Sequence, residues 1–283
     1  MTVLQPPRRR CALVAPGSDA RKAAKALASA ADEVVLDLED AVVPALKDAA
    51  RSLVCDLARS AGSRTVAVRV NAPSTQWFEA DLRACAQASS HVASVVVPKV
   101  DSVADLKEVD RVLRDSPLPV QALIETPAGV AHVGEIAAHP RVTAVIIGYA
   151  DLGAALGRSR TAPGAAWLYV QDHVLHVARA AGIQAIDGPF LGTRDDESFR
   201  EAVRWVADLG FDGKWAIYPD QIDTATSLFT PSAEQVDHAR RVLDALSTAA
   251  DRGSGAVRLD GQMLDEAVAV AARRTLAQIG IPA

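Results

Sequence analysis

The sequence has little that points to an extracellular, zinc-binding or nucleic-acid-binding protein. Its 283 residues include 3 cysteines, Cys11, Cys55 and Cys85, and no two of them form a C-x-x-C pair. These cysteines are too few for a disulfide framework, and their spacing fits no zinc or redox motif. Basic residues are not in excess either, since 30 Lys and Arg stand against 35 Asp and Glu. We therefore expect a reducing compartment and no nucleic-acid partner.

Long apolar runs are also missing. No stretch approaches the roughly 20 apolar residues that cross a bilayer, so no membrane partner is expected. The N-terminus, MTVLQPPRRR, leads into only a short apolar run, whereas a signal peptide needs about 7–15 apolar residues and a small-residue cleavage site. The expected location is cytoplasmic.

What the sequence does contain is a series of short Val- and Ile-rich runs separated by Ala-rich stretches with helical periodicity. The eight β-like runs are 11–15, 34–38, 65–70, 93–97, 120–124, 142–147, 183–186 and 214–217. The helical stretches are 19–31, 44–60, 76–88, 102–114, 129–138, 167–181 and 195–209. Strands that alternate with helices predict parallel βαβ units, and nearly continuous apolar strands predict a sheet covered on both faces. Eight such units predict the α/β class and a (β/α)₈ TIM barrel.

The alternative is an open, doubly wound sheet that binds a dinucleotide. That fold has a G-x-G-x-x-G turn after its first strand, whereas this chain has Pro16-Gly17-Ser18-Asp19. We expect the barrel to span residues 1–222. Residues 223–283 are too many for one closing helix, so we expect a C-terminal helical extension that serves as a lid or an oligomer contact. Its predicted helices are 232–250 and 262–279, on either side of a Gly-rich segment.

Polar and charged residues follow five consecutive predicted strands. In a TIM barrel, the loops after the C-terminal ends of the strands form the active site. The residues at these positions are Glu39 and Asp40, Arg69 and Asn71, Lys99, Glu125 and Thr126, and Asp151. Three of them are candidate substrate-binding residues: Glu39, Asp40 and Lys99. Each also has a purely structural alternative, because Glu39 and Asp40 could cap the next helix and Lys99 could be a solvated loop residue.

Arg69 and Glu125 belong to apolar strands or their ends, where a charge is costly unless an opposite charge pairs with it. An ion pair between them would explain both residues but would leave Asp151 unexplained. Glu125 and Asp151 follow neighbouring strands, and Mg²⁺ commonly binds one or two carboxylates together with waters and substrate oxygens. The pattern therefore predicts Mg²⁺ on Glu125 and Asp151, and a small keto or hydroxy acid whose carboxylate binds Arg69.

Other motifs give no competing site. His173 and His176 are three residues apart on a predicted helix remote from the strand ends, and there is no H-E-x-x-H or G-x-S-x-G sequence. The segment Gly210–Lys214 contains a Gly-Lys pair without the spacing of a P-loop. Zinc chemistry and nucleotide hydrolysis are therefore not expected.

Eight segments, taken together and in order, resemble the citrate lyase beta subunit-like (CitE-like) branch of the HpcH/HpaI aldolase family. They are RCALVAPG (10–17), LDLEDAV (36–42), RVNA (69–72), VPKV (97–100), IETPAG (124–129), GYADL (148–152), GFDGKWAIYPDQ (210–221) and LDGQMLD (259–265). The similarity extends from about residue 10 to residue 276. It implies a TIM barrel that assembles as a homotrimer or as a hexamer made of two trimers.

The resemblance also implies a chemistry. Family members bind Mg²⁺ through the residues that match Glu125 and Asp151, and bind the substrate carboxylate through the residue that matches Arg69. They cleave or form a C–C bond in β-hydroxyacyl-CoA thioesters of the malyl-, citramalyl- or citryl-CoA type, with a keto acid and an acyl-CoA as cleavage products. Two alternatives stay open: thioesterase activity on the same compounds, and a citrate lyase beta subunit that works in a complex with an acyl carrier.

Three further positions follow from the resemblance alone. Arg21 and Lys25 match a loop that contacts CoA, so they are expected to bind its phosphates. Asp265 matches an acid/base residue that a neighbouring subunit's lid supplies, so the candidate catalytic residues are Arg69, Glu125 and Asp265.

The chain departs from the family pattern in two places. Tyr218 stands where the family usually has His, which removes a titratable group and adds a bulkier phenol. Arg158 and Arg160 are additional arginines that could select a more acidic substrate or could be solvated.

Overall fold

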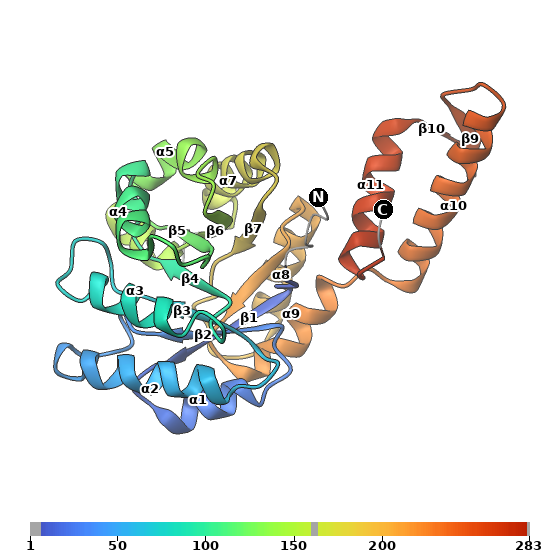
Figure 1. Ribbon diagram of the computed structural model, residues 1–283. Coiled ribbons are helices and arrows are strands. Elements are labelled where there is room, and N and C mark those ends of the chain that lie inside the picture. Colours follow the sequence, from blue (N-terminus) through green and yellow to red (C-terminus); the bar gives the residue numbers. More distant parts are fainter. Residues whose placement is uncertain (1–6, 160–163, 282–283) are drawn as a thin grey trace. The chain divides into compact units, whose positions relative to one another are not determined.

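The computed structural model describes residues 7–159 and 164–281. Eight parallel strands follow one another around a closed barrel, and β1 pairs with both β2 and β8 (Figure 1). The strands are β1 (Cys11–Pro16), β2 (Glu33–Asp37), β3 (Thr65–Arg69), β4 (Ser94–Val97), β5 (Val120–Ile124), β6 (Val142–Ile147), β7 (Gln184–Asp187) and β8 (Gly213–Ala216). The predicted TIM barrel is confirmed, and every strand lies within one residue of its predicted ends.

Helices connect the strands and surround the barrel (Figure 1). They are α1 (Ala20–Leu27), α2 (Lys47–Ser60), α3 (Phe78–Gln87), α4 (Val103–Leu113), α5 (Pro127–Ala137), α6 (Tyr149–Ala155), α7 (Leu168–Ala181), α8 (Glu197–Leu209) and α9 (Ile222–Leu228). Short 3₁₀ helices are η1 (Pro44–Leu46), η2 (Gly164–Trp167) and η3 (Pro219–Gln221). The sequence pattern missed α6 and α9, because seven residues are too few to show helical periodicity.

Side-chain caps determine where several of these helices begin. Asp19 accepts a hydrogen bond from the backbone N of Lys22 at the start of α1, and Asp196 caps α8 in the same way. Ser102 forms a capping box with Asp105 at the start of α4. Each cap satisfies backbone N–H groups that the first turn of a helix leaves free.

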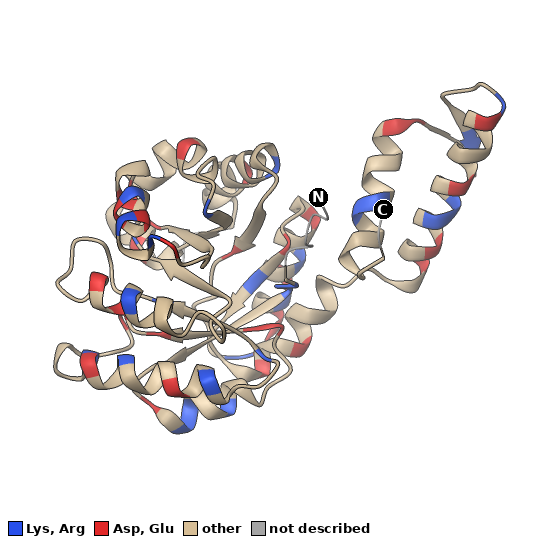
Figure 2. Ribbon diagram, viewed as in Figure 1, with Lys and Arg blue, Asp and Glu red and all other residues tan. Residues whose placement is uncertain are grey.

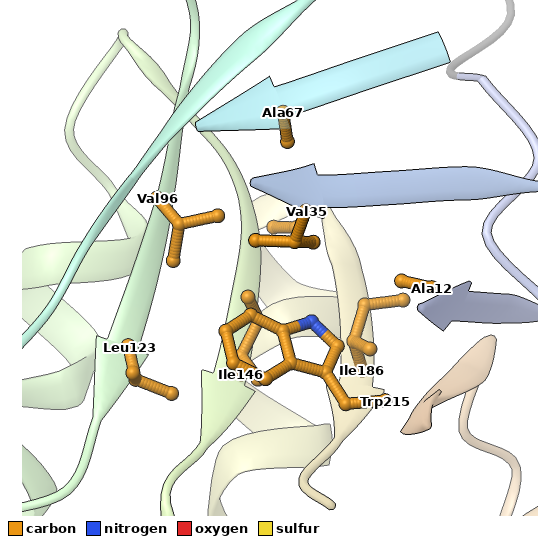
Figure 3. Packing of buried hydrophobic residues seen from close by; sticks show 9 residues of the cluster. Ala12, Val35, Ala67, Val96, Leu123, Ile146, Ile186 and Trp215 are labelled. Carbon is orange, nitrogen blue, oxygen red and sulfur yellow. The ribbon is translucent and has the colours of Figure 1, made fainter. Parts of the chain in front are cut away.

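Apolar side chains fill the middle of the barrel. The ring of Trp215 lies among Val35, Ile146 and Ile186, with Leu123 on the far side (Figure 3). These residues point inward, and side chains two positions apart on a strand share a face. The residues two positions further along a strand therefore face the C-terminal mouth of the barrel, and those two positions before face its N-terminal end.

The N-terminal end of the barrel is closed by a buried polar cluster. Arg9 lies across it, with its Nε 3.0 Å from Glu33 Oε1 and its Nη1 bonded to the Gln184 side chain. Gln121 donates to Glu33 and, at 2.8 Å, to Ser94 Oγ. Gly213 leaves room for this cluster, because a Cβ there would lie 1.7 Å from the backbone oxygen of Arg9.

The chain divides into two compact units, Met1–Ser227 with the barrel and Leu228–Ala283. Its helices α10 (Ala233–Asp251) and α11 (Glu266–Gln278) pack through a small apolar core that includes Val242 and Leu276. The antiparallel strands β9 (Val257–Leu259) and β10 (Gln262–Leu264) connect them.

One expectation for this unit was wrong. A helix was predicted over 262–279, but its first residues belong to strand β10. Asp260 and Gly261 have φ angles of 50° and 81°, as in a tight hairpin turn, so the chain reverses there before α11 begins.

Within the described ranges, no helix is long and apolar enough to cross a membrane. Lys and Arg are interspersed with Asp and Glu along the helices of both units (Figure 2). The helices therefore carry both signs of charge along their length.

Candidate active site at the C-terminal end of the barrel

Four acidic side chains surround the ammonium group of Lys99 at the C-terminal mouth of the barrel. Its Nζ lies 2.6 Å from Glu39 Oε1, 3.8 Å from Asp151 Oδ1, and 4.0 Å from both Glu125 Oε1 and Asp40 Oδ2. These residues follow four different strands, so the barrel brings together positions far apart in the sequence. All five were predicted as site residues, and the structure places them in one cluster.

Lys99 has an unusual backbone conformation. Its φ of 51° is in the left-handed region, which is uncommon for a residue other than glycine. In this conformation its backbone N donates to Glu125 Oε1 at 2.9 Å. Burial lowers the pKa of Lys99, but the hydrogen bond to Glu39 and the surrounding carboxylates outweigh it and raise the pKa to about 12. Lys99 is therefore a permanent cation of the site.

Arg69 binds Asp37 rather than Glu125. Its Nε and Nη2 each donate at 2.7 Å to one oxygen of Asp37, and its Nη1 lies 3.0 Å from Glu39 Oε2. The alternative of a direct Arg69–Glu125 ion pair is thus wrong, although Glu125 still contributes to the field at Arg69. Two donors of the guanidinium are already used, and Nη1 is the group that faces the acidic cluster.

Asp37 was not singled out from the sequence. It is fully buried, and burial by itself would raise its pKa, but the charge and hydrogen bonds of Arg69 outweigh this and lower the pKa. Asp37 also accepts from the backbone N of Glu39 at 2.8 Å. A signal was present, because Asp37, Arg69 and Glu125 each come two residues after an inward-facing core residue of their own strand or its continuation.

The carboxyl groups of Glu125 and Glu39 are both poorly solvated. Burial, the charge of Glu39 and that of Asp151 together raise the pKa of Glu125 to about 8. Burial also raises the pKa of Glu39. Among the described residues, Glu39 Oε2 is buried without a hydrogen bond, since the nearby Arg69 N–H is poorly aligned with it.

Gly148 allows Glu125 to occupy its position. A Cβ on Gly148 would lie 2.4 Å from both Cβ and Oε2 of Glu125. Gly148 comes two residues after the inward-facing Ile146, so it faces the same mouth of the barrel. The G-Y-A-D segment therefore provides space for one carboxylate and, at Asp151, supplies another.

Lys47 supports the loop after β2 from behind. Its buried ammonium donates to the backbone oxygens of Leu38 and Glu39, each at 2.7 Å, and to Asn71 Oδ1 at 2.5 Å. Asn71 in turn donates to Asp81 at 2.6 Å. Sequence spacing gave no sign of these contacts, because Lys47 and Asp81 lie on helices that only the folded barrel brings to the strand ends.

The remaining predicted residues lie elsewhere. Arg21 and Lys25 are exposed on α1. The loop before this helix is joined to the end of β2 by a hydrogen bond from the backbone N of Gly17 to the backbone oxygen of Asp37 at 2.7 Å. Tyr218 is 39% exposed after β8.

Asp265 belongs to the second compact unit. There it caps α11 by accepting from the backbone N of Ala267 at 3.0 Å. Arg158 follows α6, and Arg160 lies outside the described residues.

The donors at the mouth suit a hard divalent cation. No group of three or more His, Cys, Asp and Glu in the described part of the chain is arranged to hold a metal ion. Mg²⁺ needs fewer protein ligands, because it keeps waters and takes substrate oxygens. Glu125 and Asp151 both approach one positively charged nitrogen, so their oxygens already face a common cation position.

The fold and the site define a (β/α)₈-barrel protein. At the C-terminal ends of strands β2 to β6 it carries an acidic cluster together with the positively charged side chains of Arg69 and Lys99. The model of the HpcH/HpaI aldolase/citrate lyase family matches residues 10–219, and the chain belongs to this family. The resemblance found in the sequence motifs is thereby confirmed.

Known relatives match over nearly the whole chain. A (3S)-malyl-CoA thioesterase of Cereibacter sphaeroides strain KD131 is 38% identical over 271 residues, which are 95% of this chain and 94% of the relative. An L-malyl-CoA/beta-methylmalyl-CoA lyase of Cereibacter sphaeroides strain ATCC 17029 is 36% identical, with 92% of each chain covered. Among solved structures, protein CitE from Mycobacterium tuberculosis in complex with magnesium, acetoacetate and coenzyme A has a TM-score of 0.79 and 33% identity, and covers 98% of this chain and 100% of that one.

Proposed function

We propose that the chain is a Mg²⁺-dependent carbon–carbon lyase that cleaves a β-hydroxyacyl-CoA thioester into a keto acid and an acyl-CoA. The observation that carries this proposal is the convergence of Glu39, Glu125 and Asp151 on one cation at the mouth of the barrel. Relatives named as malyl-CoA enzymes make malyl-CoA the first substrate to test, with citramalyl- and citryl-CoA next.

Glu125 and Asp151 are the residues that would hold Mg²⁺. When bound, the ion polarises substrate oxygens and orients the substrate. Arg69, held in place by Asp37, presents Nη1 to the substrate carboxylate, and Lys99 adds a second positive charge beside it. Asp40 is exposed at the rim of the cluster and would contact the polar end of the substrate.

The bond changes define what the side chains must do. The substrate hydroxyl loses its proton, its C–O bond becomes the carbonyl of the keto acid, and the electron pair of the broken C–C bond forms a thioester enolate. The enolate carbon then takes one proton to give the acyl-CoA. Glu39 Oε2 supports a role as proton acceptor, because it is a buried carboxylate oxygen without a hydrogen bond from the described residues. Asp265 would supply a proton to the enolate.

The proposal for Asp265 includes the assembly. We infer that residues 223–283 act as a lid that reaches the site of a neighbouring subunit in a homotrimer or hexamer. Arg21 and Lys25 would bind the phosphates of CoA, since both are exposed on the helix next to β2. A cytoplasmic location, where CoA thioesters are made and used, fits the same proposal.

The direct test separates two products. Purified protein is incubated with Mg²⁺ and malyl-, citramalyl- or citryl-CoA, and keto acid and free thiol are measured independently. Keto acid without thiol supports the lyase. No keto acid from any of the three, under conditions where Mg²⁺ binds, would overturn the proposal.

Thioesterase activity is the second candidate, and the 38% identity with a malyl-CoA thioesterase favours it. In that case water attacks the thioester carbonyl, the C–S bond breaks, and free CoA appears without keto acid. A third reading is a beta subunit that uses a protein-bound acyl carrier. It predicts no turnover of any free CoA ester and recovery of activity when the acyl carrier is supplied.

A further inference from the structure

A cavity lies outside the barrel, between helices α6, α7 and α8 and the outer side of β7 and β8. Its volume is about 930 Å³, which is within the range of small-molecule sites in proteins. Lys214 and Asp187 form its floor. They are neighbours of the inward-facing Trp215 and Ile186, so their side chains point outward, away from the interior of the barrel.

The floor of the cavity is polar and fully paired. Lys214 Nζ bonds to the Asp187 carboxylate and donates to the backbone oxygen of Gly188 at 2.6 Å. The Tyr149 hydroxyl donates to Asp187, and Gln171 donates to that hydroxyl at 2.8 Å. Lys214 and Asp187 are 2% and 1% exposed. Such a network fixes the floor and leaves it without a net charge to attract a ligand.

Aromatic side chains line the walls. The rings of Tyr149 and Trp167 meet edge to face at 5.0 Å, and Trp205 Nε1 donates to Gln171 Oε1 at 2.9 Å. Phe190 also lines the cavity. Trp205 is 41% exposed, which is high for such a large apolar side chain. Walls of this kind favour a flat apolar body, because ring stacking and burial contribute together.

A single cationic group on the wall has an unused donor. Arg158 lies over the ring of Trp167, with its Cζ 4.6 Å from the ring centroid. Its Nη1 is buried, yet it has no hydrogen-bond partner among the residues that the structure describes. A buried N–H of a guanidinium without an acceptor is costly, and a ligand carboxylate would satisfy it.

We propose that this cavity binds a small aromatic carboxylic acid, with its ring among Tyr149, Trp167 and Trp205 and its carboxylate on Arg158. The site is separate from the acidic cluster. Helix α6 lies between them: Asp151 on this helix reaches Lys99 in the cluster, whereas Tyr149 and Gly153 of the same helix line the cavity.

Calorimetric titration of the full chain with indole-3-propionate tests the proposal. We expect saturable binding of one molecule per chain. Indole-3-propionamide keeps the shape and removes the charge, so it is expected to bind at least about tenfold more weakly, because one charge-assisted hydrogen bond is lost. Equal binding of acid and amide would overturn the role of Arg158, and the absence of saturable binding would overturn the site.

Variants locate the binding. Arg158→Gln is expected to weaken the acid at least about tenfold and to leave the amide unchanged. Arg204→Gln is the matched control, since Arg204 is an arginine of α8 that pairs with Glu197 at the surface. Ala202→Phe fills the cavity from α8 and should abolish binding of both compounds. Binding that survives both Arg158→Gln and Ala202→Phe would contradict the assignment.

Competition separates this cavity from the substrate site. Coenzyme A with Mg²⁺ is added before the titration, and the affinity for indole-3-propionate is measured again. Unchanged stoichiometry with both ligands present supports two sites. Complete displacement by coenzyme A would overturn a separate site, whereas failure of coenzyme A to bind would count against the proposed function and leave the cavity assignment intact.

Discussion

At the scale of single residues, the protonation of Glu125 connects the barrel to its metal. A carboxyl group with a pKa of about 8 keeps its proton at neutral pH, and Mg²⁺ has to displace that proton in order to bind. The apparent affinity for Mg²⁺ should therefore rise about tenfold per pH unit from pH 6 to about pH 8, and level off above it. Calorimetric titration at a series of pH values measures this dependence, and a flat profile would contradict it.

The same shift has a consequence for stability. The pKa of Glu125 is raised in the folded state, so the unfolded chain releases this proton first as pH rises. Stability of the metal-free protein should fall between about pH 4.5 and about pH 8, by at most about 1.4 kcal/mol per pH unit from this group. Mg²⁺ should accordingly raise the melting temperature more at pH 8 than at pH 6.

A substitution at Gly148 tests whether Mg²⁺ binding depends on the observed position of the Glu125 side chain. Gly148→Ala introduces a Cβ against Glu125, so we expect Mg²⁺ affinity to fall about 10- to 100-fold, as when a ligand loses its positioning contacts. Gly134→Ala is the control, because that glycine lies in α5, where the new Cβ would have no atom within 4 Å apart from its chain neighbours and the backbone of its own helix. Unchanged Mg²⁺ affinity in Gly148→Ala would show that Glu125 does not need its observed position.

At the scale of elements, alternation along the strands made much of the site predictable. Arg69 and Glu125 come two residues after the inward-facing Ala67 and Leu123, so they lie on the inward side of β3 and at the end of β5. The sequence shows both as charged residues at the end of an apolar run. Asp37 obeys the same rule and could have been found by applying it to β2. The partner of Arg69 was not predictable from charge alone, because three carboxylates compete for it: Asp37 at the end of β2, Glu39 after β2 and Glu125 after β5.

Contacts made by helices were beyond the reach of the sequence pattern. Lys47 reaches the loop after β2 from α2, and its role depends on how that helix packs on the barrel. Helix α6 is too short for its periodicity to be read. In each case the strands were predicted within one residue, while the side chains that support their ends depend on tertiary packing.

The buried Arg9–Glu33 pair at the N-terminal end of the barrel gives a prediction for the stability of the barrel. Arg9→Met leaves the fully buried Glu33 without its cation, so we expect a loss of about 3–5 kcal/mol in the free energy of unfolding. Adding Glu33→Gln removes the uncompensated charge and should recover much of that loss. Denaturant unfolding of both variants measures it.

Arg59→Met is the matched control for that experiment. Arg59 pairs with Asp56 at the surface of α2, where an exposed ion pair contributes at most about 1 kcal/mol. If Arg9→Met and Arg59→Met lowered the free energy of unfolding by similar amounts, the buried Arg9–Glu33 pair would contribute no more to stability than an exposed pair.

At the scale of the whole molecule, the proposed sharing of a site between subunits makes a prediction about mixtures. Glu125→Gln and Asp265→Asn should each be inactive as pure proteins. When they are unfolded and refolded together, a site made of Glu125 from one subunit and Asp265 from the next should be complete in about a quarter of cases. Recovered lyase activity of about that fraction supports the shared site.

Pure Asp265→Asn refolded alone provides the reference for this mixture. If the mixture shows no more activity than the two pure variants added together, Asp265 acts within its own chain or has no catalytic role. The motif LDGQMLD suggested Asp265 through the family resemblance, since spacing along one chain carries no signal for a site shared between subunits.

Helix α6 contributes residues to both proposed sites, and this can couple Mg²⁺ binding to ligand binding in the aromatic cavity. One face carries Asp151, the proposed metal ligand, and the other forms a wall of the aromatic cavity. Any occupant that shifts the helix changes the affinity for Mg²⁺, and thermodynamic linkage requires Mg²⁺ to change the affinity for that occupant by the same factor. Titrating Mg²⁺ with and without saturating indole-3-propionate measures this factor, and thereby whether the cavity acts as a control point for the enzyme.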